Sequence, residues 1–320
     1  MKNKRENMPQ KISVLGVPCY LGLGDRRGDA NGGPEAILNA GLIEALSLSG
    51  YDVSYRDVKA TSEHPEIFDS HKDPKGKIQY GKNIADVIAL LHARAYSSLL
   101  TGGKVLALGG DHSIVPGTIG SALAYAELKQ KTLGLVWIDA HADVHTDTTS
   151  HSHHANGMPL GIALGRGSRK LRAPIGFRKV LPQNVLHIGL GTDDCEPEEL
   201  AAFEELHITS FSQERLARGG FAPCLHALRD LAGRVDYLWV SFDLDAVNRK
   251  YAPGVSFINN TGLAPKNVLS CADEVARSGK LLGADIVEYN RVNEKFDKAG
   301  NAKTATLAVT FAQRLFHQQK

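Results

Sequence analysis

LGLVWIDAHAD, residues 133–143, joins an apolar run to a charged end. Its first six residues form an unbroken apolar run, which is typical of a strand buried on both faces in a parallel sheet covered by helices. Alternate residues of an extended chain share a face, so Asp139 and His141 point the same way, and Asp143 joins them if the chain turns after Ala142. Three such side chains at the end of a buried strand lose hydration and repel one another, and a cation is the simplest group that neutralises them.

The composition is that of an ordinary soluble globular protein with a large core. The 320 residues are 42% hydrophobic and 22% charged, which favours one α/β domain over residues 11–320 rather than two. Residues 1–10, MKNKRENMPQ, are polar and lack the apolar segment of a secretion signal, so we expect a disordered leader. No apolar run approaches the roughly 18 residues of a membrane-spanning helix, so we expect no membrane partner.

The net charge limits the binding partners to be expected, and the cysteine content indicates the cellular compartment. The formal net charge is only +2, and the Lys and Arg residues are scattered along the chain. We therefore expect no nucleic-acid partner, while a small anionic or zwitterionic substrate remains open. The four cysteines stand far apart without a CxxC pair, which is typical of reduced thiols in a cytoplasmic protein. They are Cys19, Cys195, Cys224 and Cys271.

Apolar runs and helical periodicity alternate along the whole chain. We expect eight strands, at residues 11–18, 53–58, 104–108, 133–138, 185–190, 208–211, 235–242 and 282–287. Between them we expect helices at 36–48, 83–100, up to 126, 198–205, 221–231 and 265–276, with a last helix at 304–316. Residues 59–77 indicate a surface loop. Strands that alternate with helices of this length predict a parallel sheet of about eight strands with helices on both faces.

Four of the predicted strands end in the same kind of polar segment. These segments are GGDHS at 109–113, DAHAD at 139–143, SFDLD at 241–245 and VE at 287–288. Ligands bind outside the carboxyl ends of strands in open parallel sheets, so the four segments should converge. The candidate metal ligands are His112, Asp139, His141, Asp143, Asp243 and Asp245. For Asp111 the alternative of a helix cap stays open.

Four carboxylates and two imidazoles favour a pair of divalent ions such as manganese. Tetrahedral zinc sites prefer sulfur and nitrogen ligands, whereas oxygen-rich mixed sites suit harder ions. Two ions roughly 3.5–4 Å apart can share a bridging water and lower its pKa towards neutrality. This chemistry provides a hydroxide nucleophile without a catalytic serine or cysteine.

The three longer polar segments, in this order and at this spacing, resemble the metal motifs of the ureohydrolases, the arginase and agmatinase superfamily. RRGDANGGPEAILNAGL at 26–42 resembles the N-terminal loop and first helix of arginases, and DIVEYN at 285–290 resembles the family's glutamate segment. The resemblance implies a three-layer αβα fold around an eight-stranded parallel sheet. It also implies two Mn²⁺ per subunit and hydrolysis of a small guanidino substrate to urea and an amine. Members of the family commonly assemble as homo-oligomers, as trimers or hexamers.

The resemblance assigns roles to the candidate residues. His112 and Asp143 would hold one ion and His141 and Asp245 the other, with Asp139 and Asp243 shared by both. Asp143 would also accept a hydrogen bond from the bridging hydroxide and aim it at the guanidinium carbon. Glu288 matches the glutamate that pairs with the substrate guanidinium, and a carboxylate can hold that planar group with two hydrogen bonds. The alternative for Glu288 is an ordinary surface glutamate at a strand end.

The segment VHTDTTSHSHHANGMP, residues 144–159, departs from the arginase pattern. His145 stands where arginases have an Asn that contacts the substrate carboxylate, and Ser152 matches a Ser with the same role. His154 replaces a second Asn, and Asn156 replaces the His that carries a proton to the leaving amine. An amide cannot titrate, and general acid–base catalysis contributes roughly 10²–10⁴-fold.

His153 or His154 is therefore the candidate replacement for the missing proton carrier. The alternative is that this His-rich loop is only solvated or binds stray metal. Further along the chain, Asp194 falls where an arginase binds the substrate amino group.

Three hypotheses follow. The first is an arginase-like hydrolase that converts L-arginine to L-ornithine and urea. The second is a ureohydrolase of different specificity, for agmatine, another guanidino acid or formiminoglutamate. The third is a weakly active or inactive relative that keeps the fold for a structural role, and the complete set of six ligands argues against it.

Overall fold

The computed structural model describes residues 9–24, 32–58 and 78–318, apart from the side chain of Asp194. The expected leader at 1–10 lies almost wholly outside the described residues. The expected surface loop at 59–77 lies wholly outside them.

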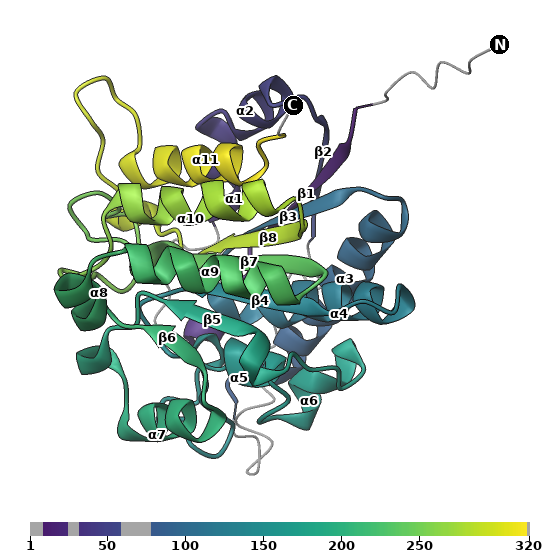
Figure 1. The fold of residues 1–320 in the computed structure, drawn as a ribbon, viewed down its shortest axis with the longest axis vertical. Coiled ribbons are helices and arrows are strands. Elements are labelled where there is room, and N and C mark those ends of the chain that lie inside the picture. Colours follow the sequence, from purple (N-terminus) through teal and green to yellow (C-terminus); the bar gives the residue numbers. More distant parts are fainter. Residues whose placement is uncertain (1–8, 25–31, 59–77, 319–320) are drawn as a thin grey trace.

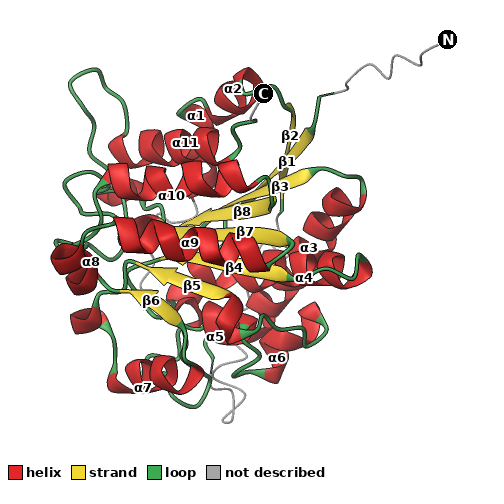
Figure 2. Ribbon diagram, viewed as in Figure 1, coloured by secondary structure: helices red, strands yellow, loops and turns green. Residues whose placement is uncertain are grey.

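One parallel sheet of eight strands forms the centre of the molecule, as the sequence predicts (Figure 2). The strands are β1 (Lys11–Val17), β2 (Asp52–Asp57), β3 (Lys104–Gly109), β4 (Leu133–Ile138), β5 (Val185–Ile188), β6 (Thr209–Phe211), β7 (Tyr237–Asp243) and β8 (Leu281–Val287). Their order across the sheet is β2-β1-β3-β8-β7-β4-β5-β6, and every neighbouring pair is parallel.

Helices cover both faces of the sheet (Figure 1). One face carries α1 (Gly33–Asn39), α2 (Leu42–Leu48), α8 (Gln213–Gly219), α9 (Ala222–Arg234), α10 (Pro265–Ser278) and α11 (Lys303–Leu315). The other carries α3 (Gly81–Leu100), α4 (Val115–Leu128), α5 (Pro159–Ala163), α6 (Arg169–Arg172) and α7 (Pro197–Leu206). Side chains of β4 alternate between the two cores, with Val136 and Ile138 in one and Leu135 and Trp137 in the other.

The predicted helix at 36–48 is wrong in one respect, because the structure divides it into α1 and α2. Gly41 lies between them with φ at +93°, a left-handed conformation that ends a helix and that glycine adopts without a steric cost. The sequence analysis also missed the short helices α5, α6 and α8, which have too few residues to show helical periodicity. Within the described part of the chain, no helix is both long enough and apolar enough to cross a membrane.

Candidate metal centre

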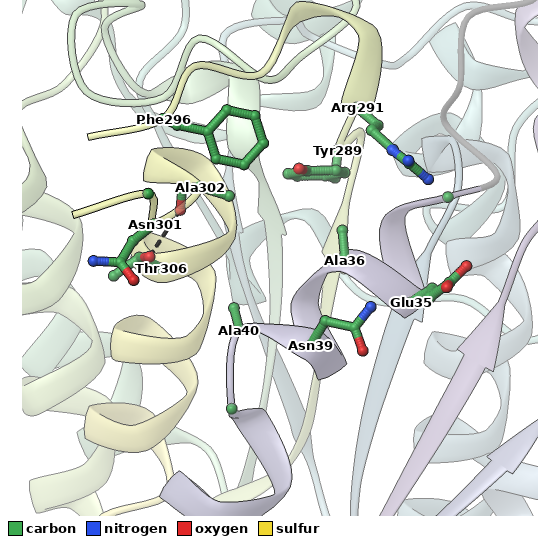
Figure 3. Close-up of a pocket in the computed structure, with 13 residues that line it drawn as sticks. Glu35, Ala36, Asn39, Ala40, Tyr289, Arg291, Phe296, Asn301, Ala302 and Thr306 are labelled. Atoms are coloured by element: carbon green, nitrogen blue, oxygen red, sulfur yellow. Dashed lines mark hydrogen bonds between the residues drawn. The ribbon is translucent and has the colours of Figure 1, made fainter. Parts of the chain in front are cut away.

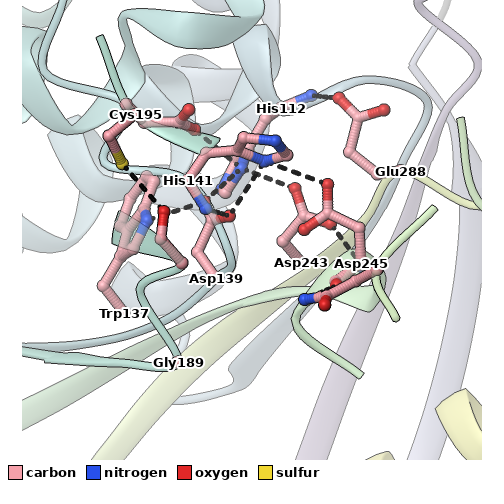
Figure 4. Close-up of polar contacts among 12 residues, drawn as sticks. His112, Trp137, Asp139, His141, Gly189, Cys195, Asp243, Asp245 and Glu288 are labelled. Carbon is pink, nitrogen blue, oxygen red and sulfur yellow. Dashed lines mark hydrogen bonds and ion pairs between the residues drawn. The ribbon is translucent and has the colours of Figure 1, made fainter. Parts of the chain in front are cut away.

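Four adjacent strands at the centre of the sheet bring the predicted polar segments together. In the order β3, β8, β7 and β4, their carboxyl ends carry His112, Glu288, Asp243 and Asp139. All strands point the same way, so these side chains meet at one edge of the sheet (Figure 4). The convergence expected from the sequence is therefore present.

The first group of ligands surrounds the imidazole of His112. Its Nδ1 lies 3.2 Å from Asp139 Oδ2, 3.0 Å from Asp143 Oδ2 and 3.1 Å from Asp243 Oδ2. All four residues are buried. Three carboxylate oxygens and one ring nitrogen that face a common point form a donor set suited to a divalent cation.

The second group of ligands lies beside the first and shares Asp139 with it. His141 Nδ1 is 3.1 Å from Asp245 Oδ2 and 3.6 Å from Asp139 Oδ1. His112, Asp139 and Asp243 form one set of atoms close enough to hold an ion, and Asp139, His141 and Asp245 form another. The structure thus brings all six predicted ligands into two neighbouring clusters.

Hydrogen bonds from residues behind the clusters orient the ligands. The shared Asp139 accepts from Trp137 Nε1 at 2.9 Å through Oδ2 and from the His141 backbone at 2.7 Å through Oδ1. His112 Nε2 lies 3.0 Å from Ser241 Oγ, and the Trp137 ring stacks on His112 at 4.5 Å. Donation from Nε2 to Ser241 would leave the Nδ1 lone pair directed at the carboxylates, as a metal ligand requires.

Trp137 and Ser241 are functional neighbours that the sequence analysis missed. Each stands two residues before a ligand, Asp139 and Asp243, on the same strand or its end. The two-residue period of a strand places them on the ligand's face, and this signal could have identified them.

Two site residues have a backbone conformation that is uncommon outside glycine. Asp143 has φ at +53° and Glu288 has φ at +65°. The left-handed conformation at Asp143 is the expected turn after Ala142, and it returns the carboxylate to the His112 ring. Such conformations cost free energy and persist at positions where the surroundings fix them, which often are functional sites.

The electrostatics of the clusters fit bound cations. Burial raises the pKa of Asp143 to about 8, and the nearby charge of Asp139 adds to the effect. Burial opposes charge on His112, but its hydrogen bonds with Asp139 and Asp143 raise the pKa of the ring well above its ordinary value. Among the described residues, Asp245 Oδ1 is buried without a hydrogen-bond partner. Divalent cations would stabilise the charged carboxylates and take up such free oxygens.

Glu288 lies beside the clusters but is held differently. It is 2% exposed, and its Oε1 accepts a hydrogen bond from the His112 backbone at 2.8 Å. Its Oε2 is buried and makes no hydrogen bond within the described residues. Burial and the negative charge of Asp111 raise the pKa of Glu288 well above its ordinary value. The free oxygen is therefore available to a cationic ligand, and the alternative of a surface glutamate is wrong.

Asp111 acts as a cap rather than as a ligand. Its Oδ1 accepts a hydrogen bond from the Ser113 backbone at 2.9 Å, at the start of the short turn His112–Ile114. Its Oδ2 accepts another from the Gly22 backbone at 2.7 Å. Both oxygens are committed to backbone donors, which decides the alternative that the sequence left open.

The predicted substrate-binding residues contact other residues than the metal ligands do. His145 lies between Thr149 and the acidic residues Glu196 and Glu199. Ser152 Oγ accepts from the His154 backbone at 3.3 Å, and the imidazole of His154 lies against Gly24.

Three further candidate residues, Asn156, His153 and Asp194, lie in or near short turns. Asn156 lies in the 3₁₀ turn Ala155–Gly157 and is partly buried. His153 has φ at +57°, and its backbone amide donates to Ser150 Oγ at 3.1 Å. Asp194 ends the turn Thr192–Asp194, but its side chain lies outside the described ones.

A cavity of about 520 Å³ lies away from the metal clusters, between α1 and the segment 291–302 (Figure 3). Glu35, Asn39, Tyr289, Arg291 and Phe296 line it. Its lining contains no histidine and a single carboxylate, that of Glu35, so it offers no carboxylate–imidazole set of the kind that the two clusters provide.

Comparisons with known proteins agree with this geometry. The model of the arginase family matches residues 10–317. The chain is 29% identical to an arginase from Brevibacillus brevis over 313 residues, which cover 96% of this chain and 100% of that protein. It is 30% identical to arginase-1 from Bos taurus over 313 residues, which cover 95% and 92% of the two chains. The solved structure of the arginase from Bacillus caldovelox matches with a TM-score of 0.85 and 30% identity, covering 97% of this chain and 99% of that one. The chain therefore belongs to the arginase family of metal-dependent hydrolases.

Proposed function

We propose that the protein is a dinuclear manganese enzyme that hydrolyses L-arginine to L-ornithine and urea. The observation that carries the proposal is the pair of buried carboxylate–imidazole clusters that share Asp139. L-Arginine is the first candidate substrate because relatives that align over nearly the whole chain are arginases. We further expect a cytoplasmic homo-oligomer whose partner is the small guanidino substrate.

Two Mn²⁺ ions fit the donor set that the side chains provide. His112 and Asp143 would hold one ion, His141 and Asp245 the other, and Asp139 and Asp243 would contribute to both. When bound, the ions supply Lewis-acid activation of a water molecule, which needs no serine or cysteine nucleophile. The carboxylates supply the negative charge that stabilises the two cations at this buried edge of the sheet.

The protein's own residues have three tasks in this reaction. The Glu288 carboxylate binds the substrate guanidinium and orients its carbon, because Oε2 is free and buried. Asp143 accepts a hydrogen bond from the attacking water and so aligns it. His154 is the proposed donor of a proton to the leaving amine, since Asn156 cannot titrate. His145, Ser152, Asn156 and Asp194 are the proposed contacts to the rest of the substrate.

A second candidate function is hydrolysis of a different substrate, such as agmatine, another guanidino acid or formiminoglutamate. One observation favours it. His145 makes its contacts to Thr149, Glu196 and Glu199, and a ring engaged in this way is a poor partner for a substrate carboxylate.

The test is release of urea from guanidino compounds by the manganese-loaded protein. We expect urea and ornithine in equal amounts from L-arginine. Urea only from another compound would replace L-arginine by that compound. Formamide from formiminoglutamate, without urea from any guanidino compound, would make formiminoglutamate the substrate. Neither product, despite bound manganese, would contradict the proposed function and support an inactive relative.

A further inference from the structure

Strand β5 lies beside β4 and contacts the segment that carries Asp139 and His141. His187 of β5 is the register partner of Trp137 of β4, so the two side chains lie on the same face of the sheet. Trp137 donates a hydrogen bond to the ligand Asp139. The Nε2 atom of His187 lies 2.9 Å from the backbone oxygen of His141. Two neighbouring side chains behind the site thus contact two successive candidate ligands.

The surroundings of His187 determine where its ring carries a proton. A carbonyl oxygen only accepts hydrogen bonds, so Nε2 is the donor and bears the proton. The ring is fully buried, and its Nδ1 makes no hydrogen bond within the described residues. A second proton on Nδ1 would create a buried charge without a partner there, so the ring is neutral. Phe203 packs edge-on against it with ring centroids 5.2 Å apart, which holds the donor in one direction.

His141 is the candidate ligand that the surrounding side chains enclose least. Its side chain is 28% exposed, whereas those of the other five candidate ligands are at most 6% exposed. Its position is therefore fixed largely through its backbone. The His141 amide donates to Asp139 Oδ1 at 2.7 Å, and its carbonyl oxygen accepts from His187. Hydrogen bonds of this outer kind orient the ligands of metal sites.

We propose that His187 is a positioning residue that fixes His141 for the ion held by His141 and Asp245. The inference rests on the proposed two-ion centre, and it adds a residue that is not itself a ligand. The ion at His112 depends on another support, because the His112 ring is held by Ser241 on its far side. Loss of the His187 donor therefore weakens binding of the ion at His141 and leaves binding of the ion at His112 unchanged.

The experiment measures the two manganese affinities separately, by calorimetric titration of the metal-free full chain. Electron paramagnetic resonance detects the coupled pair of ions in parallel. His187→Leu removes the donor and keeps an apolar side chain in the buried position. We expect its affinity for one ion to fall by about 10–100-fold, as is usual when an outer hydrogen bond of a metal site is lost, and its affinity for the other ion to stay at the wild-type value. The variant then shows a single uncoupled ion at manganese concentrations that give a coupled pair in the wild type.

Two polar variants separate the hydrogen bond from the packing of the ring. The amide nitrogen of His187→Gln occupies the place of Nε2 and can donate to the same oxygen, so this variant should restore the coupled pair. The shorter amide of His187→Asn does not reach that oxygen and should show the same selective loss as His187→Leu, including where the leucine variant fails to fold. The matched control is His92→Leu on α3, which also removes a hydrogen bond from a histidine to a backbone group, that of Gly117. This control should keep both affinities.

The outcomes separate the inference from the proposed function. An equal loss of both affinities in His187→Asn, no loss of either, or a loss that His187→Gln does not restore would overturn the positioning role. Urea release by the wild type is measured independently. A selective loss of one ion in His187→Asn, together with no urea from the manganese-loaded wild type, would refute the proposed reaction and leave the inference standing. A wild type that binds fewer than two ions would refute both.

Discussion

Glu288 combines three features that suit a residue for binding a cation. It is buried, it has a left-handed backbone, and one of its oxygens has no hydrogen-bond partner in the described structure. Glu288→Gln keeps the shape but removes the charge that would bind the guanidinium in the proposed reaction. We expect kcat/KM to fall by at least about 100-fold, because hydrogen bonds to charged groups contribute about 1.5–3 kcal/mol each. Steady-state urea release measures the loss.

The manganese content of the same variant is the control. Glu288 is not among the proposed ligands, so Glu288→Gln should retain as much metal as the wild type. Loss of metal would show that Glu288 belongs to the metal centre and not to the substrate site.

Single residues also show what the sequence could and could not predict. The meeting of the candidate ligands was predictable because each follows a strand whose apolar run is plain in the sequence. The environment of His145 was not, because its partners Glu196 and Glu199 are more than 50 positions away in the sequence. The burial of Glu288 could not be predicted either, because it depends on the neighbouring strand β3.

At the scale of elements, the turn after β3 places His112, and Gly110 makes that turn possible. A Cβ at Gly110 would lie 1.6 Å from the backbone oxygen of Cys19, a separation that requires the backbone to move. We expect Gly110→Ala to lower the free energy of unfolding by about 3 kcal/mol or more and to weaken metal binding. Urea denaturation measures the first effect.

The matched control is Gly233→Ala in α9, where a Cβ meets open space. That variant should be as stable as the wild type or more stable by up to about 1 kcal/mol, because alanine favours a helix. A Gly110→Ala protein of wild-type stability would contradict the proposed role of the close approach to Cys19.

Elements differ in how well their sequences predict them. The eight strands were predictable because apolar runs that alternate with amphipathic helices fit few folds other than a parallel sheet covered by helices. The division between α1 and α2 was not, because Gly41 continues a helical pattern and only its positive φ shows the break. Strand order was also out of reach, since β7 and β8 enter the centre of the sheet from the end of the chain.

For the molecule as a whole, we expect the buried carboxyl of Asp285 to make the free energy of unfolding depend on pH. This residue of β8 is fully buried and accepts a hydrogen bond from Trp239 Nε1 at 2.6 Å. Burial raises the pKa of Asp285 from 3.8 to about 7. Between these values the folded protein binds more protons than the unfolded one, so this group makes the free energy of unfolding fall as pH rises.

Asp285→Asn removes this titration. In metal-free protein, we expect the stability of the variant relative to wild type to increase by about 3 kcal/mol from pH 5 to pH 8, at about 1.4 kcal/mol per pH unit between pH 5 and the folded pKa of about 7. Chemical denaturation at the two pH values measures it, with Asp273→Asn on α10 as a control. A constant difference between variant and wild type would show that Asp285 does not titrate in this range.

In the proposed metal centre, two cations would share the carboxylate of Asp139. The most direct measurement is the manganese stoichiometry of the purified chain, with electron paramagnetic resonance to detect coupling between the ions. We predict two coupled Mn²⁺ per chain in the wild type, and loss of the coupled pair together with urea release in Asp139→Ala. A single uncoupled ion in the wild type, or an intact pair in Asp139→Ala, would contradict a two-ion centre that shares Asp139.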